Sequence, residues 1–273
     1  MRFAIVYSKL NSAGKLIAEE FQKLAYAPQF PIIELKKETL YSDDLTPEKY
    51  PELRNIDFII FTSTHKSAKG NPSLSIHAPG NWRSADLGGH PYKICPTSAF
   101  VLKYLFQNLN KIYEENKQNL KEEYQITLEV THHGPLIKIP CCFIELGSSE
   151  KQWQDKEAAK ILAKTLVTLQ DYPNKNNINN WIPSIGIGGP HYAPNFNKVQ
   201  LLSNYAISHI IPEYSLPLTE SMLKEAEEKT TEQIKEVLID WKGCGKSEQR
   251  QKILDALKHL GYSVKRTSEI SKD

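Results

Sequence analysis

The chain has 273 residues, of which 40% are hydrophobic and 24% are charged, and its formal net charge is +2. This length fits one large α/β domain, or a core with a small appendage, and the composition excludes a disordered chain. The small net charge also excludes a protein that binds nucleic acid through overall positive charge, so any RNA contact needs a local basic patch.

From residue 1 to about residue 112, buried strands alternate with amphipathic helices. Short apolar runs predict three strands, at residues 3–7, 31–35 and 57–62. Cap residues followed by an apolar stripe predict helices from about 11 to 24 and from Thr97, the expected N-cap, to about 112. Residues 63–96 are rich in Gly, Pro, Ser and His without periodicity, so we expect a long functional loop there.

The alternation continues from residue 125 onward. Apolar or alternating runs predict four more strands, at residues 125–131, 141–146, 182–187 and 207–211. Gly147-Ser148-Ser149 precedes a predicted helix that reaches about residue 166, and residues 174–180 predict a polar loop. Strands that alternate with helices favour an α/β fold, a three-layer sandwich around a mixed, largely parallel sheet.

The tail of the chain differs in charge from the rest. Residues 217–240 are acidic and residues 242–266 are basic, with Gly243-Cys244-Gly245 between them. We therefore place an α/β catalytic core at residues 1–215 and expect a small helical C-terminal appendage at residues 216–273. Lys246 and Arg250 in the basic part are candidates for phosphate contacts, and a solvated helix face is the alternative.

Unusual residues follow four of the predicted strands. They are Thr64-His65-Lys66, His132-His133-Gly134-Pro135, Gly147-Ser148-Ser149 and Gly188-Gly189-Pro190-His191-Tyr192. Because ligands bind outside the carboxyl ends of the strands in open α/β sheets, we expect these residues to share one rim. A scatter of unrelated histidines would not give this arrangement.

Neutral imidazoles and a carboxylate are the usual ligands of a catalytic zinc ion, which activates water for hydrolysis. We expect His77, His132 and His191 to hold zinc, and His133 or Glu145 to act as the general base. No HExxH motif is present, and single histidines are often structural. Adjacent residues of a strand point to opposite faces, so His132 and His133 both face the site only if the strand has ended before them.

Several further residues are candidates for contacts with RNA. A helix that begins at Gly147-Ser148-Ser149 offers backbone N–H groups to an anion, although an ordinary capped helix has the same sequence. Trp82 could stack on a base, or it could fix the long loop to the core. The expected RNA-binding or phosphate-binding residues are Ser148, Ser149, Lys66, Trp82, Lys246 and Arg250.

The four cysteines, Cys95, Cys141, Cys142 and Cys244, lack the paired spacing of a cysteine zinc site. We expect them to be buried thiols in a reducing compartment. No apolar run approaches the roughly 18 residues of a membrane span, and the run at residues 3–7 is too short for a signal peptide. A cytoplasmic protein without membrane contact is therefore expected.

Five ordered blocks of uncommon residues resemble the D-aminoacyl-tRNA deacylase family of archaea and plants, and the resemblance covers nearly the whole chain. The blocks are Thr62-Ser63-Thr64-His65, Ser75-Ile76-His77-Ala78-Pro79-Gly80-Asn81-Trp82, Glu129-Val130-Thr131-His132-His133-Gly134-Pro135, Glu145-Leu146-Gly147-Ser148-Ser149 and Gly188-Gly189-Pro190-His191-Tyr192-Ala193-Pro194. The resemblance implies hydrolysis of the ester between a D-amino acid and the acceptor end of tRNA. It also implies dependence on zinc and a core similar to peptidyl-tRNA hydrolase and the nucleoside phosphorylases.

Other functions stay open from the sequence. The same core and rim fit a peptidyl-tRNA hydrolase-like enzyme or a metal-dependent amidohydrolase. A tRNA-binding protein without turnover is an alternative from another class, and in a third reading the histidines are purely structural. No apolar helix face is left over in the sequence, so we expect a monomer.

Overall fold

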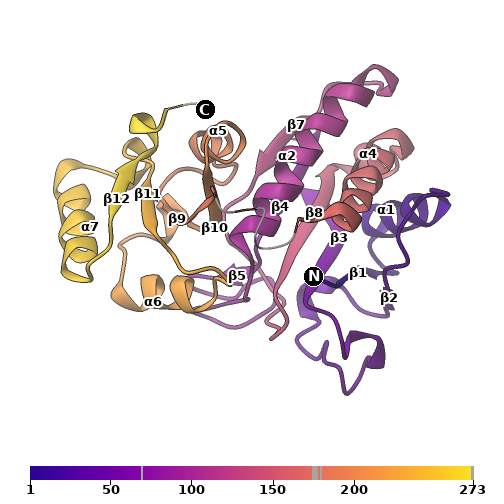
Figure 1. Cartoon of the computed structure of the whole chain (residues 1–273), viewed down its shortest axis with the longest axis horizontal. Helices are drawn as coiled ribbons and strands as arrows, with labels where there is room; N and C mark the ends of the chain where they lie inside the picture. The colour runs from indigo at the N-terminus through magenta and orange to yellow at the C-terminus, as the bar shows by residue number, and fades with distance from the viewer. Residues whose placement is uncertain (69, 174–177, 179, 272–273) are drawn as a thin grey trace.

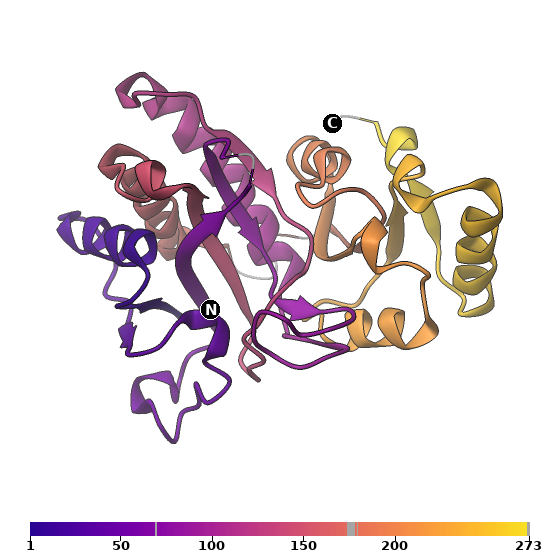
Figure 2. The same cartoon turned by 180° about the vertical axis from the view of Figure 1, so that it is seen from behind.

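The structure is a computed structural model that describes residues 1–68, 70–173, 178 and 180–271. Its strands form two main sheets, which lie on opposite sides of helix α2 (Ala99–Asn116) (Figures 1 and 2). Most of the predicted loop at 174–180 lies outside the described residues. No helix in the described part of the chain is both long enough and apolar enough to cross a membrane.

The first sheet has six strands in the order β2-β1-β3-β8-β4-β7. All neighbouring strands are parallel except β4 and β8, which are antiparallel, so the sheet is mixed and largely parallel. The strands are β1 (Phe3–Ser8), β2 (Ile32–Leu35), β3 (Phe58–Lys66), β4 (Ser73–His77), β7 (Gln125–Leu128) and β8 (Cys141–Ser148).

The central strands β3 and β8 are apolar on both faces because both faces are covered. One face packs against α1 (Ser12–Lys23), α2 and α4 (Lys156–Val167). The other face packs against side chains from loops and a short 3₁₀ helix, such as Leu45, Leu53 and Ile137. Asn11 caps α1, since its Oδ1 accepts a hydrogen bond from the Gly14 N–H at 2.9 Å.

The second sheet is wholly parallel and has the order β10-β9-β11-β12. Its strands are β9 (Ile182–Ile187), β10 (Tyr205–Ile211), β11 (Glu236–Ile239) and β12 (Val264–Arg266). On one face lie α2 and α5 (Pro194–Leu202), and on the other lie α6 (Glu220–Glu228) and α7 (Ser247–His259). Helices thus lie on both sides of parallel strands in a three-layer α/β fold, as the sequence predicted.

Two local predictions were wrong. Residues 63–96 are not one loop, because β3 continues to Lys66 and β4, β5 (Gly80–Asn81) and β6 (Lys93–Ile94) follow. Serine alternates with apolar residues in β4, yet all five residues are buried between β8 and β7. The N-cap of α2 is Ser98, whose Oγ accepts from the Val101 N–H at 3.1 Å, whereas the Thr97 hydroxyl donates to the Cys141 carbonyl.

We had expected a purely helical segment after residue 215, but this segment also contains strands. It contributes β11 and β12 to the second sheet, together with α6 and α7. These strands have only four and three residues, which is too short for a clear period in the sequence. The division of the chain at residue 215 stays a prediction, and it separates β10 from β11 within one sheet.

Candidate metal centre and active site

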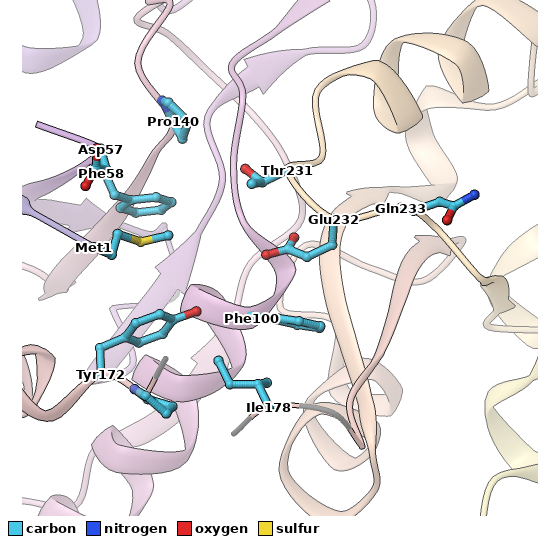
Figure 3. A pocket seen from close by; sticks show the side chains of 11 residues that line it. Met1, Asp57, Phe58, Phe100, Pro140, Tyr172, Ile178, Thr231, Glu232 and Gln233 are labelled. Carbon is cyan, nitrogen blue, oxygen red and sulfur yellow. The ribbon is translucent and has the colours of Figure 1, made fainter. Parts of the chain in front are cut away.

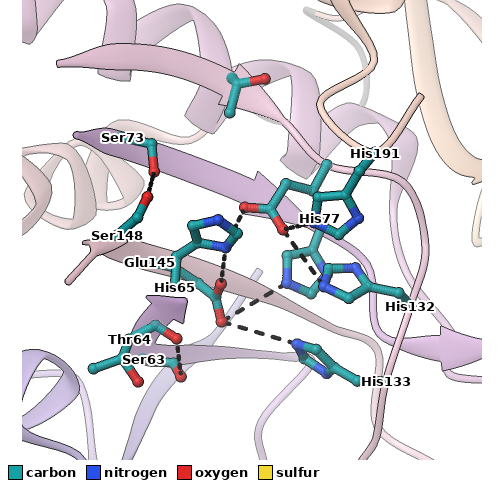
Figure 4. A network of polar contacts seen from close by, with 12 residues as sticks. Ser63, Thr64, His65, Ser73, His77, His132, His133, Glu145, Ser148 and His191 are labelled. Carbon is teal, nitrogen blue, oxygen red and sulfur yellow. Dashed lines mark hydrogen bonds and ion pairs between the residues drawn. The ribbon is translucent and has the colours of Figure 1, made fainter. Parts of the chain in front are cut away.

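Buried carboxylates and imidazoles meet where the edge of the first sheet faces the second (Figure 4). Glu145 lies in the central strand β8, opposite Ser63 of β3 and Ser75 of β4. His77 ends β4, and Glu129 follows the last residue of β7. The sheet register therefore brings residues far apart in sequence to one place.

His132 and His133 both face this cluster because β7 ends at Leu128, well before them. His133 has a φ of 46°, which turns the backbone away from an extended path. The ring centroids of His132 and His133 are each within 5 Å of that of His77, at 4.3 Å and 4.8 Å. The strand has thus ended before His132 and His133, which is the condition under which we expected both residues to face one site.

Three of the histidines are oriented in the same way. Nδ1 of His77, His132 and His133 lies 3.2, 2.8 and 2.6 Å from a backbone carbonyl oxygen. A carbonyl only accepts hydrogen bonds, so in the neutral rings Nδ1 carries the proton and Nε2 keeps a free lone pair. The hydrogen bond from Nδ1 to the carbonyl fixes the tautomer in the way that is typical of metal-ligating histidines.

Glu129 joins these rings to a second set of side chains. Its Oε2 lies 2.9 Å from His191 Nε2 and 3.4 Å from His132 Nε2, and its Oε1 lies 3.0 Å from His65 Nδ1. Glu145 lies on the other side of the cluster. Its carboxylate oxygens are 3.6, 3.8 and 3.9 Å from nitrogens of His65, His77 and His133.

The ligand atoms form three overlapping groups that could hold a metal ion, each with its atoms within 4.8 Å of one another. The groups are His77-His132-His133, His65-Glu129-His191 and His77-Glu129-Glu145. The structure therefore groups His191 with His65 and Glu129, whereas the sequence analysis grouped it with His77 and His132. His133, which we expected to be a general base, lies in the group of three imidazoles.

The electrostatics of the cluster keep its carboxylates ionised. Burial opposes ionisation of Glu129, but contacts with His191 and His65 outweigh it and hold the Glu129 pKa well below its usual value. Burial likewise opposes the charge of Glu145, yet contacts with His65 and His77 lower its pKa. Two buried negative charges beside imidazole nitrogens favour the binding of a cation between them.

The imidazoles differ in their affinity for protons. Burial, followed by the charges of His77 and its neighbours, lowers the pKa of His132 well below its usual value and that of His133 to about 4. Burial also disfavours protonation of His65, but Glu129 and Glu145 raise its pKa to about 11. His132 and His133 are therefore neutral near pH 7, as metal ligands must be.

The donor set fits a divalent metal ion. Nε2 of His77 is buried and makes no hydrogen bond to any described residue, and it lies 3.8 Å from a carboxylate oxygen of Glu145. Leaving such a group unpaired costs about 1–3 kcal/mol. A cation beside Nε2 would remove this cost and balance the charge of Glu145 and Glu129.

The serines expected to bind an anion have other partners. Ser148 Oγ donates to the Asn71 carbonyl at 2.5 Å and is buried, and Ser149 Oγ lies 2.5 Å from Gln152 Oε1. The helix that follows, α3 (Glu150–Trp153), has only four residues. This segment forms a capped turn, and anion binding by Ser148 and Ser149 stays a prediction.

Trp82 is buried, and its Nε1 donates to the Ile210 carbonyl at 3.1 Å, so it fixes its segment to the second sheet. Lys66 and Lys246 are exposed. The Arg250 guanidinium lies 5.1 Å from the centroid of the Trp241 ring. The RNA contacts of these residues stay a prediction.

A pocket of about 380 Å³ opens beside the cluster and shares His132 and His133 with it. Its remaining lining comes from residues 80–84, 86 and 87, Thr131, Tyr214 and Ser215. A larger cavity of about 600 Å³ lies elsewhere, beside Met1, Phe58 and Glu232 (Figure 3). No histidine lines that cavity, whereas the smaller pocket borders the cluster.

His65 and Glu129 were not among the predicted site residues, although both stand in the blocks that carry the family resemblance. His65 lies at the end of β3, in the rim that the sequence indicated. Glu129 occupies a polar position in the run that alternates with Ile126, Leu128 and Val130, yet it is buried. The alternating pattern therefore gave no signal that this carboxylate is buried.

Comparisons with known proteins agree with one family. The sequence profile of the D-aminoacyl-tRNA deacylases matches residues 52–265. The chain is 36% identical to the D-aminoacyl-tRNA deacylase of Methanocaldococcus jannaschii, over 93% of this chain and 95% of the relative. It is 35% identical to that of Pyrococcus furiosus, over 95% and 89% of the two chains.

The fold also matches a solved structure. A crystal structure described as a conserved protein of unknown function superimposes with a TM-score of 0.86 at 26% identity, over 98% of this chain and 96% of that one. Profile, relatives and fold extend over almost the whole sequence. The chain belongs to the D-aminoacyl-tRNA deacylase family.

Proposed function

We propose that this protein hydrolyses the ester bond of D-aminoacyl-tRNA, releasing the free D-amino acid and tRNA, with a zinc ion bound in the histidine cluster. The observation that carries the proposal is the shared orientation of three imidazoles, whose free Nε2 atoms lie beside two ionised buried carboxylates. Membership of the family supplies the substrate class.

Zinc is the metal that best suits a set of neutral imidazoles and carboxylates. His77, His132 and His133 would hold it, and His65, Glu129 and His191 form a second group of donors. When bound, zinc lowers the pKa of a coordinated water towards about 7 and polarises a carbonyl.

The chain's own residues do the rest of the chemistry. Glu145 takes the proton of the attacking water, because it is ionised and its oxygens reach toward His77 and His133. Since His133 belongs to the imidazole group, we favour Glu145 over His133 as the general base. Glu129 holds His191 and His65 in place through its two oxygens.

The tRNA approaches with its acceptor end at the pocket beside His132 and His133. Exposed cations such as Lys66 and Lys246 contact its phosphates. The protein acts as a monomer in the cytoplasm, where aminoacyl-tRNA is used.

The test follows ester loss from matched D- and L-tyrosyl-tRNA, before and after chelation. We expect loss of the D ester only, abolished by the chelator and restored by zinc. His132→Ala should lose bound metal together with activity, and Glu145→Gln should keep the metal but lose about 10²-fold or more in rate. His259→Ala, which changes an exposed histidine outside the cluster, is the matched control.

Each other outcome points to a different function. A peptidyl-tRNA hydrolase or amidohydrolase would instead cleave N-blocked substrates faster than the free ester. A binding protein without turnover would retain tRNA after loss of the histidines. If chelation changes the melting temperature (Tm) but no activity, the histidines are structural and the proposal is wrong.

A further inference from the structure

The pocket beside the histidine cluster has an unusual mouth. Of its lining residues, Tyr214 is 60% exposed and Leu87 is 53% exposed, although both are large and apolar. They belong to the few large hydrophobic side chains that the described part of the chain leaves exposed. Water solvates such side chains poorly, so two of them in one pocket indicate a binding surface.

Hydrogen bonds hold the two segments that line this pocket in place. The Arg83 guanidinium donates to the carbonyls of Ser215 and Pro217, at 3.0 and 2.6 Å. This ties the segment that contains Leu87 to the segment that contains Tyr214. Trp82 fixes the same segment to the Ile210 carbonyl, so the pocket is preformed.

The floor of the pocket includes residues of the proposed metal site. Thr131, His132 and His133 line it, and His132 and His133 belong to the metal-binding group. An ester that reacts at this floor has two substituents, an amino acid and the 3′-terminal adenosine of tRNA. The pocket of about 380 Å³ is large enough for one of them.

We infer that this pocket binds the 3′-terminal adenosine, with its base stacked on Tyr214 and covered by Leu87. The inference rests on the proposed function and names the part of the substrate that the pocket recognises. Unpaired bases at RNA ends bind by stacking on exposed aromatic side chains, whatever their sequence context. The adenosine is also the one part next to the ester that every aminoacyl-tRNA shares, whereas the amino acid varies.

The direct test is binding of the two halves of the substrate, adenosine 5′-monophosphate and free D-tyrosine, measured by titration calorimetry. Tyr214→Ala should weaken nucleotide binding about tenfold, as expected for loss of one stacking contact, and should leave D-tyrosine binding unchanged. Tyr214→Phe, which keeps the aromatic face, should bind the nucleotide like the wild type. Tyr26→Ala, at a tyrosine that is 57% exposed and outside the pocket, is the matched control.

Kinetics give a second measurement. Tyr214→Ala should raise KM for D-tyrosyl-tRNA about tenfold with a small effect on kcat, because the contact lies away from the reacting atoms. The inference is wrong if the variant weakens D-tyrosine binding instead, since the pocket then holds the amino acid. It is also wrong if the wild type fails to bind the nucleotide. Nucleotide binding through Tyr214 without deacylation would overturn the proposed function and leave the pocket assignment standing.

Discussion

His209 shows how a single buried residue connects the two sheets behind the site. It lies in β10, where its Nδ1 is 3.2 Å from the Thr131 hydroxyl and its ring is edge-on to Trp82. Burial is the main cause that lowers its pKa to about 4. The folded protein therefore keeps this imidazole neutral. The ring lies against Thr131, the residue that precedes His132.

The low pKa of His209 makes stability depend on pH. Between about pH 6.5 and pH 4 the unfolded chain binds a proton at His209 that the folded chain does not, so the free energy of unfolding falls as pH falls. The loss is at most about 1.4 kcal/mol per pH unit. Urea unfolding at pH 7.5 and pH 5 should therefore show a smaller acid-induced loss for His209→Gln than for the wild type. Equal losses would show that His209 titrates normally in the folded protein.

The sequence identified the chemical types of the site residues better than their groupings. It named His77, His132 and Glu145, all of which lie in the cluster. It omitted Glu129, because one carboxylate in a strand-like run has no sequence signal of burial until the sheet is assembled. The grouping of ligands depends on register between distant strands, which no local pattern contains.

In β8, the close approach of a neighbouring strand restricts which residue can occupy position 147. At Gly147 the strand passes His65 of β3 so closely that an added Cβ would lie 2.7 Å from the His65 Cβ and 2.8 Å from its Cδ2. His65 in turn contacts Glu129, Glu145 and the Tyr192 hydroxyl. A glycine here lets the imidazole reach both carboxylates.

Gly147→Ala should therefore displace His65 and reduce deacylation at least tenfold, with the fold retained. The reason is steric, since the new methyl group would overlap the base of the imidazole side chain. Gly261→Ala is the control: its φ of 78° disfavours alanine, but nothing lies within 4 Å of the new Cβ. The control should lose about 1 kcal/mol of stability and no activity. Full activity of Gly147→Ala would show that His65 is dispensable.

Elements were predictable where their sequence pattern was long. The strands at 3–7, 57–62 and 141–146 and the first helix have clear patterns, and the structure contains them. The strand β4 was missed because its buried serines look like loop residues, and β11 because four residues cannot establish a period. Tertiary packing decided these elements, since their neighbours in the sheets bury them.

At the scale of the whole molecule, the site lies between two sheets that meet edge to edge. The segment after β7 donates backbone hydrogen bonds across this boundary, from Val130 to the His191 carbonyl and from Thr131 to the Ile210 carbonyl. Glu129 and His191 therefore approach the cluster from different sheets. The alternation of strands and helices predicted the three layers, but the position of one sheet against the other depends on packing around α2.

A metal ion bound by His77, His132 and His133 should stabilise the whole protein. Binding to the folded state alone, at a free metal concentration of 100 times Kd, contributes about 2.7 kcal/mol, or roughly 5–10 °C in Tm for a chain of this size. We expect chelation to lower Tm by this amount and zinc to restore it. His132→Ala should show a smaller shift, because one of the three imidazoles proposed to hold the metal is missing, whereas His259→Ala should behave like the wild type. A Tm that does not respond to chelation in any of these proteins would mean that no metal ion stabilises the fold.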